Sequence, residues 1–212
     1  MSGDVHVRFC ERLGVRFPWA THRNLYVRSQ RAGLRVMESL VNFIMVRLKL
    51  RVSSEKSAVG RPWERKFLGF SFTSNREPRR RIAQAAVKRF KGRVRELTRR
   101  TRGVSLEEMV KELTVYLRGW QEYFGFCQTS SVLQSFDEWV RHRLRATAWK
   151  QWKQGRTRFG ELRRRGVGKA LAAQTAGSAH GPWRLANSPA LNMALPNAYF
   201  SSLGLPTLAA RG

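Results

Sequence analysis

Residues 78–102 read PRRRIAQAAVKRFKGRVRELTRRTR, and this stretch indicates what kind of domain the chain contains. It holds eleven Lys or Arg residues against a single acid, Glu96, so its net charge is +10. An apolar stripe recurs at every third or fourth position, at Ile82, Ala86, Phe90, Val94 and Leu97. This spacing predicts an amphipathic helix. Exposed helix faces usually mix charges of both signs, so a face of bases favours contact with a polyanion, and nucleic acid is the first choice.

The candidate phosphate-binding residues of this stretch are Arg79, Arg80, Arg81, Lys88, Arg89, Lys91, Arg95 and Arg99. The three arginines 79–81 would stand at the N-terminal end of the helix, where the helix dipole disfavours cations. A phosphate bound at that end would relieve the conflict.

Two more helices are expected after this stretch. Ser105 and Glu108 have the spacing of a capping box, which predicts a helix start. From there an apolar stripe runs to Phe124, and a further stripe, Leu133, Phe136, Val140 and Leu144, predicts a third helix. Three stripes of this kind can close on one another as a helical bundle.

The third helix carries a second candidate site, formed by Arg141, Arg145, Trp149 and Trp152, which would project to one side. Two interpretations are open. In the first, arginines contact the phosphate backbone of RNA and indoles stack on its bases, as in the binding of single-stranded or loop RNA. Alternatively, the two tryptophans pack under the C-terminal segment.

The regions on either side of these helices are expected to hold fewer long helices. A strand over residues 24–28, a helix over 32–50 and a strand over 66–72 form a small α+β unit. After Gly155 we expect one short helix over 168–175 and an otherwise irregular chain. The predicted fold class is therefore α+β, mainly α. Its parts are a divergent segment 1–23, the small unit 24–75, the helical domain 76–154 and an extension 155–212.

Composition excludes several classes of protein. The 212 residues carry a net charge of +27, which again favours a polyanionic partner. Cys10 and Cys127 lack metal-ligand spacing, and there is no apolar run for a membrane span. The only aspartates are Asp4 and Asp137, too few for a two-metal site. No catalytic residue and no metal ligand is therefore predicted.

Several segments occur in the order known from one family. They are NLYVRSQRAGLRVMESL (24–40), RLKLRVSSEKSAVGRPWERKFLGFSF (47–72), LRGWQEYFG (117–125), DEWVRHRLRATAWKQWK (137–153) and LPNAYFSSLGLPTL (195–208). Through them the sequence resembles the C-terminal part of bacterial group II intron-encoded reverse transcriptases/maturases, closest to class C.

The resemblance implies that residues 24–75 are like the end of the polymerase palm. Lys56 falls at the lysine of motif D, and Phe67, Leu68, Gly69 and Phe70 fall in a primer-grip-like hairpin. Residues 76–154 resemble the thumb, or maturase domain X, which binds intron RNA. The family's Tyr-Ala-Asp-Asp turn is replaced by Ala20-Thr21-His22-Arg23. Thr21 and His22 cannot supply the two carboxylates that hold catalytic magnesium.

We therefore expect an RNA-binding, maturase-like protein that stabilises folded group II intron RNA and has lost reverse transcriptase chemistry. It would bind no cofactor, and Mg²⁺ would come only through the RNA. DNA would be a nonspecific partner, no membrane would be involved, and the location would be the bacterial cytoplasm, with nucleoid or RNA. The alternatives are an RNA-directed DNA polymerase, a decayed fragment without function, and a basic protein that packages DNA.

Overall fold

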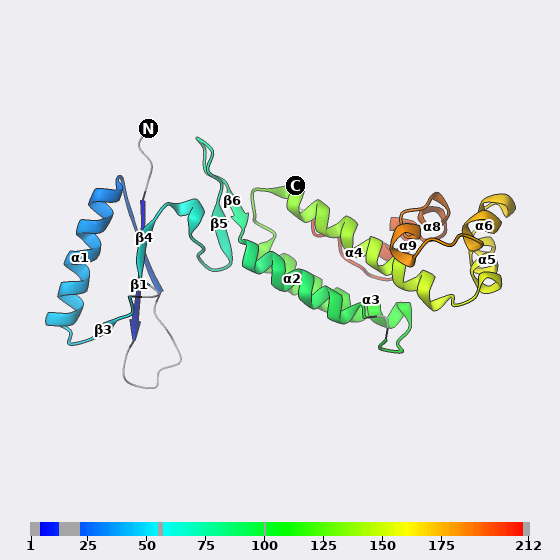
Figure 1. Ribbon diagram of the computed structural model, residues 1–212, viewed down its shortest axis with the longest axis horizontal. Coiled ribbons are helices and arrows are strands. Elements are labelled where there is room, and N and C mark those ends of the chain that lie inside the picture. Colours follow the sequence, from blue (N-terminus) through cyan, green and yellow to red (C-terminus); the bar gives the residue numbers. More distant parts are fainter. Residues whose placement is uncertain (1–4, 13–21, 55–56, 100, 210–212) are drawn as a thin grey trace. The chain divides into compact units, whose positions relative to one another are not determined.

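The computed structural model describes residues 5–12, 22–54, 57–99 and 101–209, and it divides the chain into two compact units. The first unit is Met1–Ala83 and the second is Gln84–Gly212. Strands occur only in the first unit among the described residues, and the second is helical (Figure 1). The predicted class, α+β and mainly α, is confirmed.

A small antiparallel sheet forms the first unit. Strand β1 (Val5–Arg12) pairs along its length with β2 (His22–Val27), and also with the short strands β3 (Arg51–Val52) and β4 (Ala58–Gly60). Helix α1 (Gln30–Val46) lies beside this sheet (Figure 1). The sequence predicts β2 and α1, but β1 falls in residues where we expected no regular element.

A hairpin completes the first unit after a short 3₁₀ helix, η1 (Pro62–Glu64). Strand β5 (Phe70–Phe72) pairs antiparallel with β6 (Arg80–Ile82). Before β5 the chain turns tightly at Leu68 and Gly69, which have φ of 48° and 81°, and Phe67 and Phe70 exchange both main-chain hydrogen bonds at 2.9 Å. Positive φ at both central positions is typical of the turn that joins paired strands, and glycine adopts it without strain.

This hairpin corrects the expected start of the basic helix. Arg80, Arg81 and Ile82 form β6, and helix α2 (Gln84–Leu97) begins only afterwards. The spacing of Ile82 fits the helical stripe, but the partner strand 70–72 offers the backbone of 80–82 a ladder of hydrogen bonds. The three arginines 79–81 therefore do not stand at a helix N-terminus.

Helices α2, α3 (Leu106–Phe124) and α4 (Ser130–Gln151) form the core of the second unit. The rings of Phe90, Trp120 and Phe136, one from each helix, meet at centroid distances of 4.5–5.5 Å, and all three side chains are buried. Helix α3 is capped as predicted at its start, where the Ser105 hydroxyl accepts from the Glu108 N–H at 3.1 Å. The expected three-helix bundle is confirmed.

The C-terminal part is helical, which corrects the expectation of irregular chain after Gly155. It contains five short helices: α5 (Gly155–Arg164), α6 (Lys169–Ala176), α7 (Pro182–Leu185), α8 (Pro189–Ala194) and α9 (Asn197–Ser202). Only α6 was expected. Pro182 and Pro189 are the first residues of α7 and α8, where a missing N–H costs nothing, so these prolines start helices rather than preventing them.

A buried carboxylate fastens the end of the chain to α4. Asp137 accepts hydrogen bonds from the N–H groups of Leu208 and Ala209 at 2.9 and 3.1 Å. The guanidinium of Arg141 lies 3.8 Å from the same carboxylate and donates to the Thr207 hydroxyl at 3.0 Å. Since Asp137 and Arg141 are both buried, each depends on the other for compensation of its charge.

Replacing Asp137 with Asn should lower the free energy of unfolding by about 3 kcal/mol, because Arg141 then lacks its counter-charge and one main-chain N–H meets an amide donor. The measurement is urea denaturation. The matched control is Glu138→Gln, the neighbouring exposed acid, which should change stability by less than about 0.5 kcal/mol. Equal stability of the two variants would refute the role of Asp137.

The first unit should be the less stable of the two. Among residues whose side chains the structure describes, its only buried apolar ones are Ile44, Ile82 and Ala83, and one face of α1 leaves Phe43 and Val46 about half exposed. Little apolar burial means little stabilisation. Native-state hydrogen exchange should show amides of α1 opening at a lower free energy than those of α3. Equal protection in the two helices would contradict this.

Candidate nucleic-acid interface

The cations of α2 fall into two rows that the structure treats differently. Arg89 and Arg93 lie on the side near Tyr116 of α3. Arg93 pairs with Glu96 at 2.9 Å. Beyond the end of α2, Arg102 donates two hydrogen bonds of 2.7 Å to Glu112. On this side acids of the domain itself compensate Arg93 and Arg102, whereas Arg89 is exposed and forms no ion pair among the described residues.

The second row runs along the opposite edge of α2 at steps of three and four residues. It consists of Lys88, Lys91 and Arg95, and Arg99 continues it just past the end of the helix. In the described part of the chain no acidic side chain forms an ion pair with any of them. Lys88, Arg95 and Arg99 are exposed and Lys91 is half-buried. Their charges consequently repel one another and are available to an external anion.

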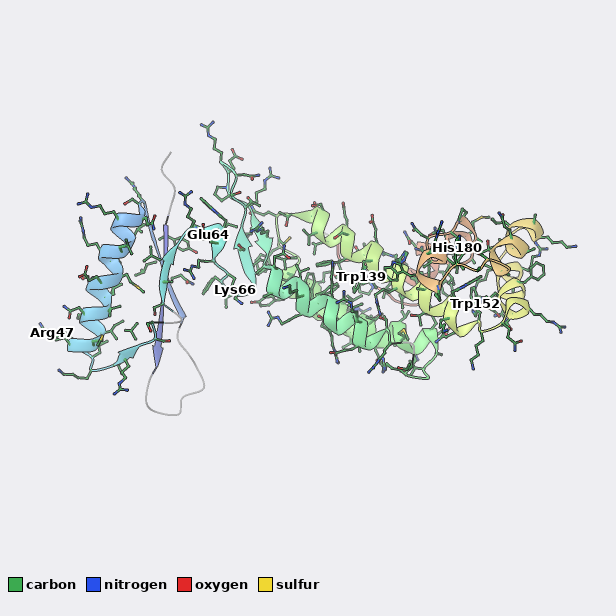
Figure 2. The ribbon with its side chains drawn as sticks, viewed as in Figure 1. Arg47, Glu64, Lys66, Trp139, Trp152 and His180 are labelled. Atoms are coloured by element: carbon green, nitrogen blue, oxygen red, sulfur yellow. The ribbon has the colours of Figure 1, made fainter. Side chains whose placement is uncertain are left out.

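An indole of α4 stands at the centre of this cationic edge, in the middle of the helical unit (Figure 2). Trp139 has Arg143 at 5.3 Å, Arg95 at 5.6 Å and Lys91 at 5.8 Å from its ring centroid, within the range of cation–π attraction. The Nε of Arg143 also donates to the Thr98 hydroxyl at 2.8 Å, which fixes α4 against the end of α2.

We call this region the Trp139 surface: Lys88, Lys91 and Arg95 of α2 with Trp139 and Arg143 of α4. The sequence analysis missed Trp139 and Arg143. The signal was present in DEWVRHR, where both residues lie four apart and outside the stripe of Phe136, Val140 and Leu144. What the sequence lacks is the packing that brings them to the cations of α2.

The arginines predicted on α4 have structural roles instead. Arg141 is held by Asp137 and Thr207. Arg145 donates through Nε to the Leu195 carbonyl at 2.9 Å and through a terminal nitrogen to Asn197 at 3.0 Å. Burial, with a further contribution from nearby Arg141, lowers the pKa of Arg145. Neither side chain is exposed as a free phosphate contact, contrary to expectation.

The two tryptophans of α4 are also buried, so the packing interpretation holds and the base-stacking one is wrong. Trp149 is fully buried, with the guanidinium of Arg158 at 4.8 Å from its ring, and Trp152 lies under Arg165 at 5.0 Å. Glu161 pairs with Arg164 and Arg165. Burial raises the pKa of Glu161, but these two arginines lower it by more, so the carboxylate stays charged.

The remaining predicted residues belong to the first unit. Arg79 directly precedes β6, and Arg80 and Arg81 lie in it. Arg81 donates to the Trp63 carbonyl at 3.4 Å. Phe67, Leu68, Gly69 and Phe70 form the turn into β5. Lys56 and Thr21 lie outside the described residues. Within the described ranges no group of three or more His, Cys, Asp or Glu is placed to hold a metal, and no helix is long and apolar enough to cross a membrane.

The helical unit is thus a basic three-helix domain in which the α2 row, without acidic partners among the described residues, and one indole form a surface suited to a polyanion. Residues 87–166 match the family model described as "Group II intron, maturase-specific domain". This segment runs from α2 to the turn after α5 and is a maturase-specific domain, as the resemblance implied. The match extends twelve residues past the expected boundary at 154. No curated protein matches the chain.

Trp149→Ala should destabilise the second unit by about 3–5 kcal/mol, because it empties a fully buried indole site and exposes Arg158 to a cavity. The measurement is the free energy of unfolding from urea denaturation, with circular dichroism as the signal. Val115→Ala is the control, since Val115 is 76% exposed on α3 and its loss should matter little. Full stability of Trp149→Ala would show that the indole is not part of the core.

Proposed function

We propose that the protein binds the structured RNA of a group II intron through the Trp139 surface and stabilises the folded form of that RNA. The single observation that carries the proposal is the arrangement of Lys91, Arg95 and Arg143 around Trp139 in a maturase-specific domain. Lys91 and Arg95, with Lys88 of the same row, have no acidic partner among the described residues. Unpaired cations in a row attract the phosphate backbone, and release of counterions from RNA supplies the free energy.

The indole contributes shape as well as attraction. The three cation–π contacts hold Lys91, Arg95 and Arg143 in fixed positions, so less side-chain entropy is lost when phosphates bind. A rigid set of charges favours one spacing of phosphates over others. This supports recognition of a folded RNA rather than of any polyanion.

In this proposal the protein supplies positive charge and a rigid surface, while the RNA and its own magnesium ions carry out transesterification. The small sheet and the hairpin 67–82 of the first unit fit the proposed likeness to the end of a polymerase palm. DNA would bind to the same cations through its phosphates, without the fit to a folded RNA.

Replacing Lys88, Lys91 and Arg95 together with Ala tests the proposal. Each phosphate contact contributes roughly 0.7–0.9 to the slope of log affinity against log salt, so the triple variant should flatten this slope by about two to three units. The slope is obtained by measuring binding to a folded group II intron RNA with fluorescence anisotropy at several salt concentrations. The apolar side of α2 is untouched, so circular dichroism should be unchanged.

A control of equal charge replaces Lys153, Arg156 and Lys169, which are exposed cations of the segment after α4 and of α5 and α6. It removes the same three charges from elements that do not form the Trp139 surface, so it should flatten the slope by clearly less. If both triple variants bind alike, the affinity reflects net charge alone. The proposed role of the Trp139 surface would then be wrong.

A further inference from the structure

A groove of about 450 Å³ lies along α4 where α7, α8 and α9 pack against it. Three asparagines line it, Asn187, Asn192 and Asn197, together with Trp183 of α7. Trp139 lines it too, so the groove borders the Trp139 surface. Pockets of this volume accommodate small planar molecules of nucleotide size.

The aromatic wall of the groove is unusually open. Trp183 is 51% exposed, although an indole is a large apolar group, and its ring meets that of His142 edge-on at 4.0 Å. Burial, with the charge of nearby Arg145, lowers the pKa of His142 despite a main-chain hydrogen bond at Trp183. This shift favours the neutral imidazole, which contacts the indole without adding charge.

The polar lining has unused hydrogen-bonding capacity. Arg141 is more than nine-tenths buried, yet its Nε has no partner among the described residues, and the same holds for Nε2 of His142. Asn192 donates from its amide nitrogen to the carbonyls of Asn187 and Ser188, so its side-chain oxygen is left to accept from a ligand. Asn197 accepts from Arg145 through its side-chain oxygen, which leaves its amide nitrogen. Buried polar groups nearly always have partners, so this lining suits a ligand with both donors and acceptors.

This combination selects a nucleobase over a phosphate. A phosphate offers only acceptors, and the carboxylate of Glu138 in the lining would repel it. Arg141 already donates through a terminal nitrogen to Thr207. Arg145 donates through Nε to the Leu195 carbonyl and through a terminal nitrogen to Asn197. A base, by contrast, stacks on an exposed indole and presents donors and acceptors along its edge.

We infer that the groove binds one unpaired nucleotide of the RNA, base first, with the base stacked on Trp183 and its edge facing the asparagine amides. The inference rests on the proposed function for the source of the nucleotide. It adds recognition of a single-stranded element, a loop or a bulge, to the contact of phosphates with the Trp139 surface.

The first experiment compares two RNAs that share one stem, a hairpin with an eight-nucleotide unpaired loop and a blunt duplex. Trp183→Ala should weaken binding of the hairpin about five-fold or more, as expected for loss of base stacking, with duplex affinity and salt slope unchanged. Asn187→Ala, which removes an exposed amide without a side-chain hydrogen bond among the described residues, should act in the same direction. Met193→Ala is the control, because Met193 is equally exposed on α8 outside the groove.

The second experiment does not depend on RNA binding. Saturation-transfer NMR on the full chain with AMP, CMP, GMP or UMP should show transfer to base protons, which Trp183→Ala abolishes and the Lys88, Lys91 and Arg95 triple variant retains. No transfer to any of the four, or hairpin binding by Trp183→Ala and Asn187→Ala equal to that of the parent chain, overturns the inference. Failure of the proposed function is a different result: the triple variant would keep its affinity and salt slope.

Discussion

The burial of α4 is the constraint on which the second unit depends. Its first half packs Phe136 against Phe90 and Trp120, and its second half buries Trp149 completely under the segment that follows. One helix of 22 residues therefore serves two cores, that of the three-helix bundle and that of α5–α9. This explains why even the arginines of α4 are enclosed: Arg141 and Arg145 lie on faces that the chain end and α9 cover.

Enclosure of α4 also determines where the positive charge can act. Arg145 donates to the Leu195 carbonyl and to Asn197, and Arg141 pairs with Asp137. These two guanidinium groups therefore stabilise the fold and are not available to an external anion. Arg93 and Arg102 have acids of their own. The row on the far edge of α2 has no such ion pairs among the described residues, and it lies beside Trp139. A net charge of +27 favours a polyanionic partner, and pairing within the domain removes some of the cations from those available to it.

Periodicity predicted the elements whose burial is local. The three long helices, the Ser105 cap, β2, α1 and the helix at 169–176 follow from stripes and capping residues within one segment. Elements that depend on distant partners were missed. Strand β6 needs β5 to pair with and leaves no strong pattern of its own. Strand β1 does alternate apolar Val5, Val7 and Phe9 with polar residues, and this strand signal was overlooked. The short helices α7–α9 bury one to three side chains each and begin at Pro182, Pro189 and Asn197, residue types that equally mark turns.

The candidate site shows the same division. Lys88, Lys91 and Arg95 were predicted because their row is a property of one helix. Trp139 and Arg143 were not, because their meeting with that row depends on how α4 crosses α2. Trp149 and Trp152 have the spacing of exposed stacking residues, and only the presence of α5–α9 buries them.

The same C-terminal helices that bury Trp149 leave Trp183 exposed at the groove beside Trp139. Among the described indoles, Trp120, Trp149 and Trp152 are buried in the core, whereas Trp183 stays exposed at the groove wall, where its ring meets that of His142. Since Trp139 lines both the groove and the cationic surface, an RNA backbone on α2 would lie next to the position where a base could leave its stack. In the proposed complex, charge would set affinity and the groove would set which RNA is preferred, because phosphates are alike in every RNA and unpaired bases are not.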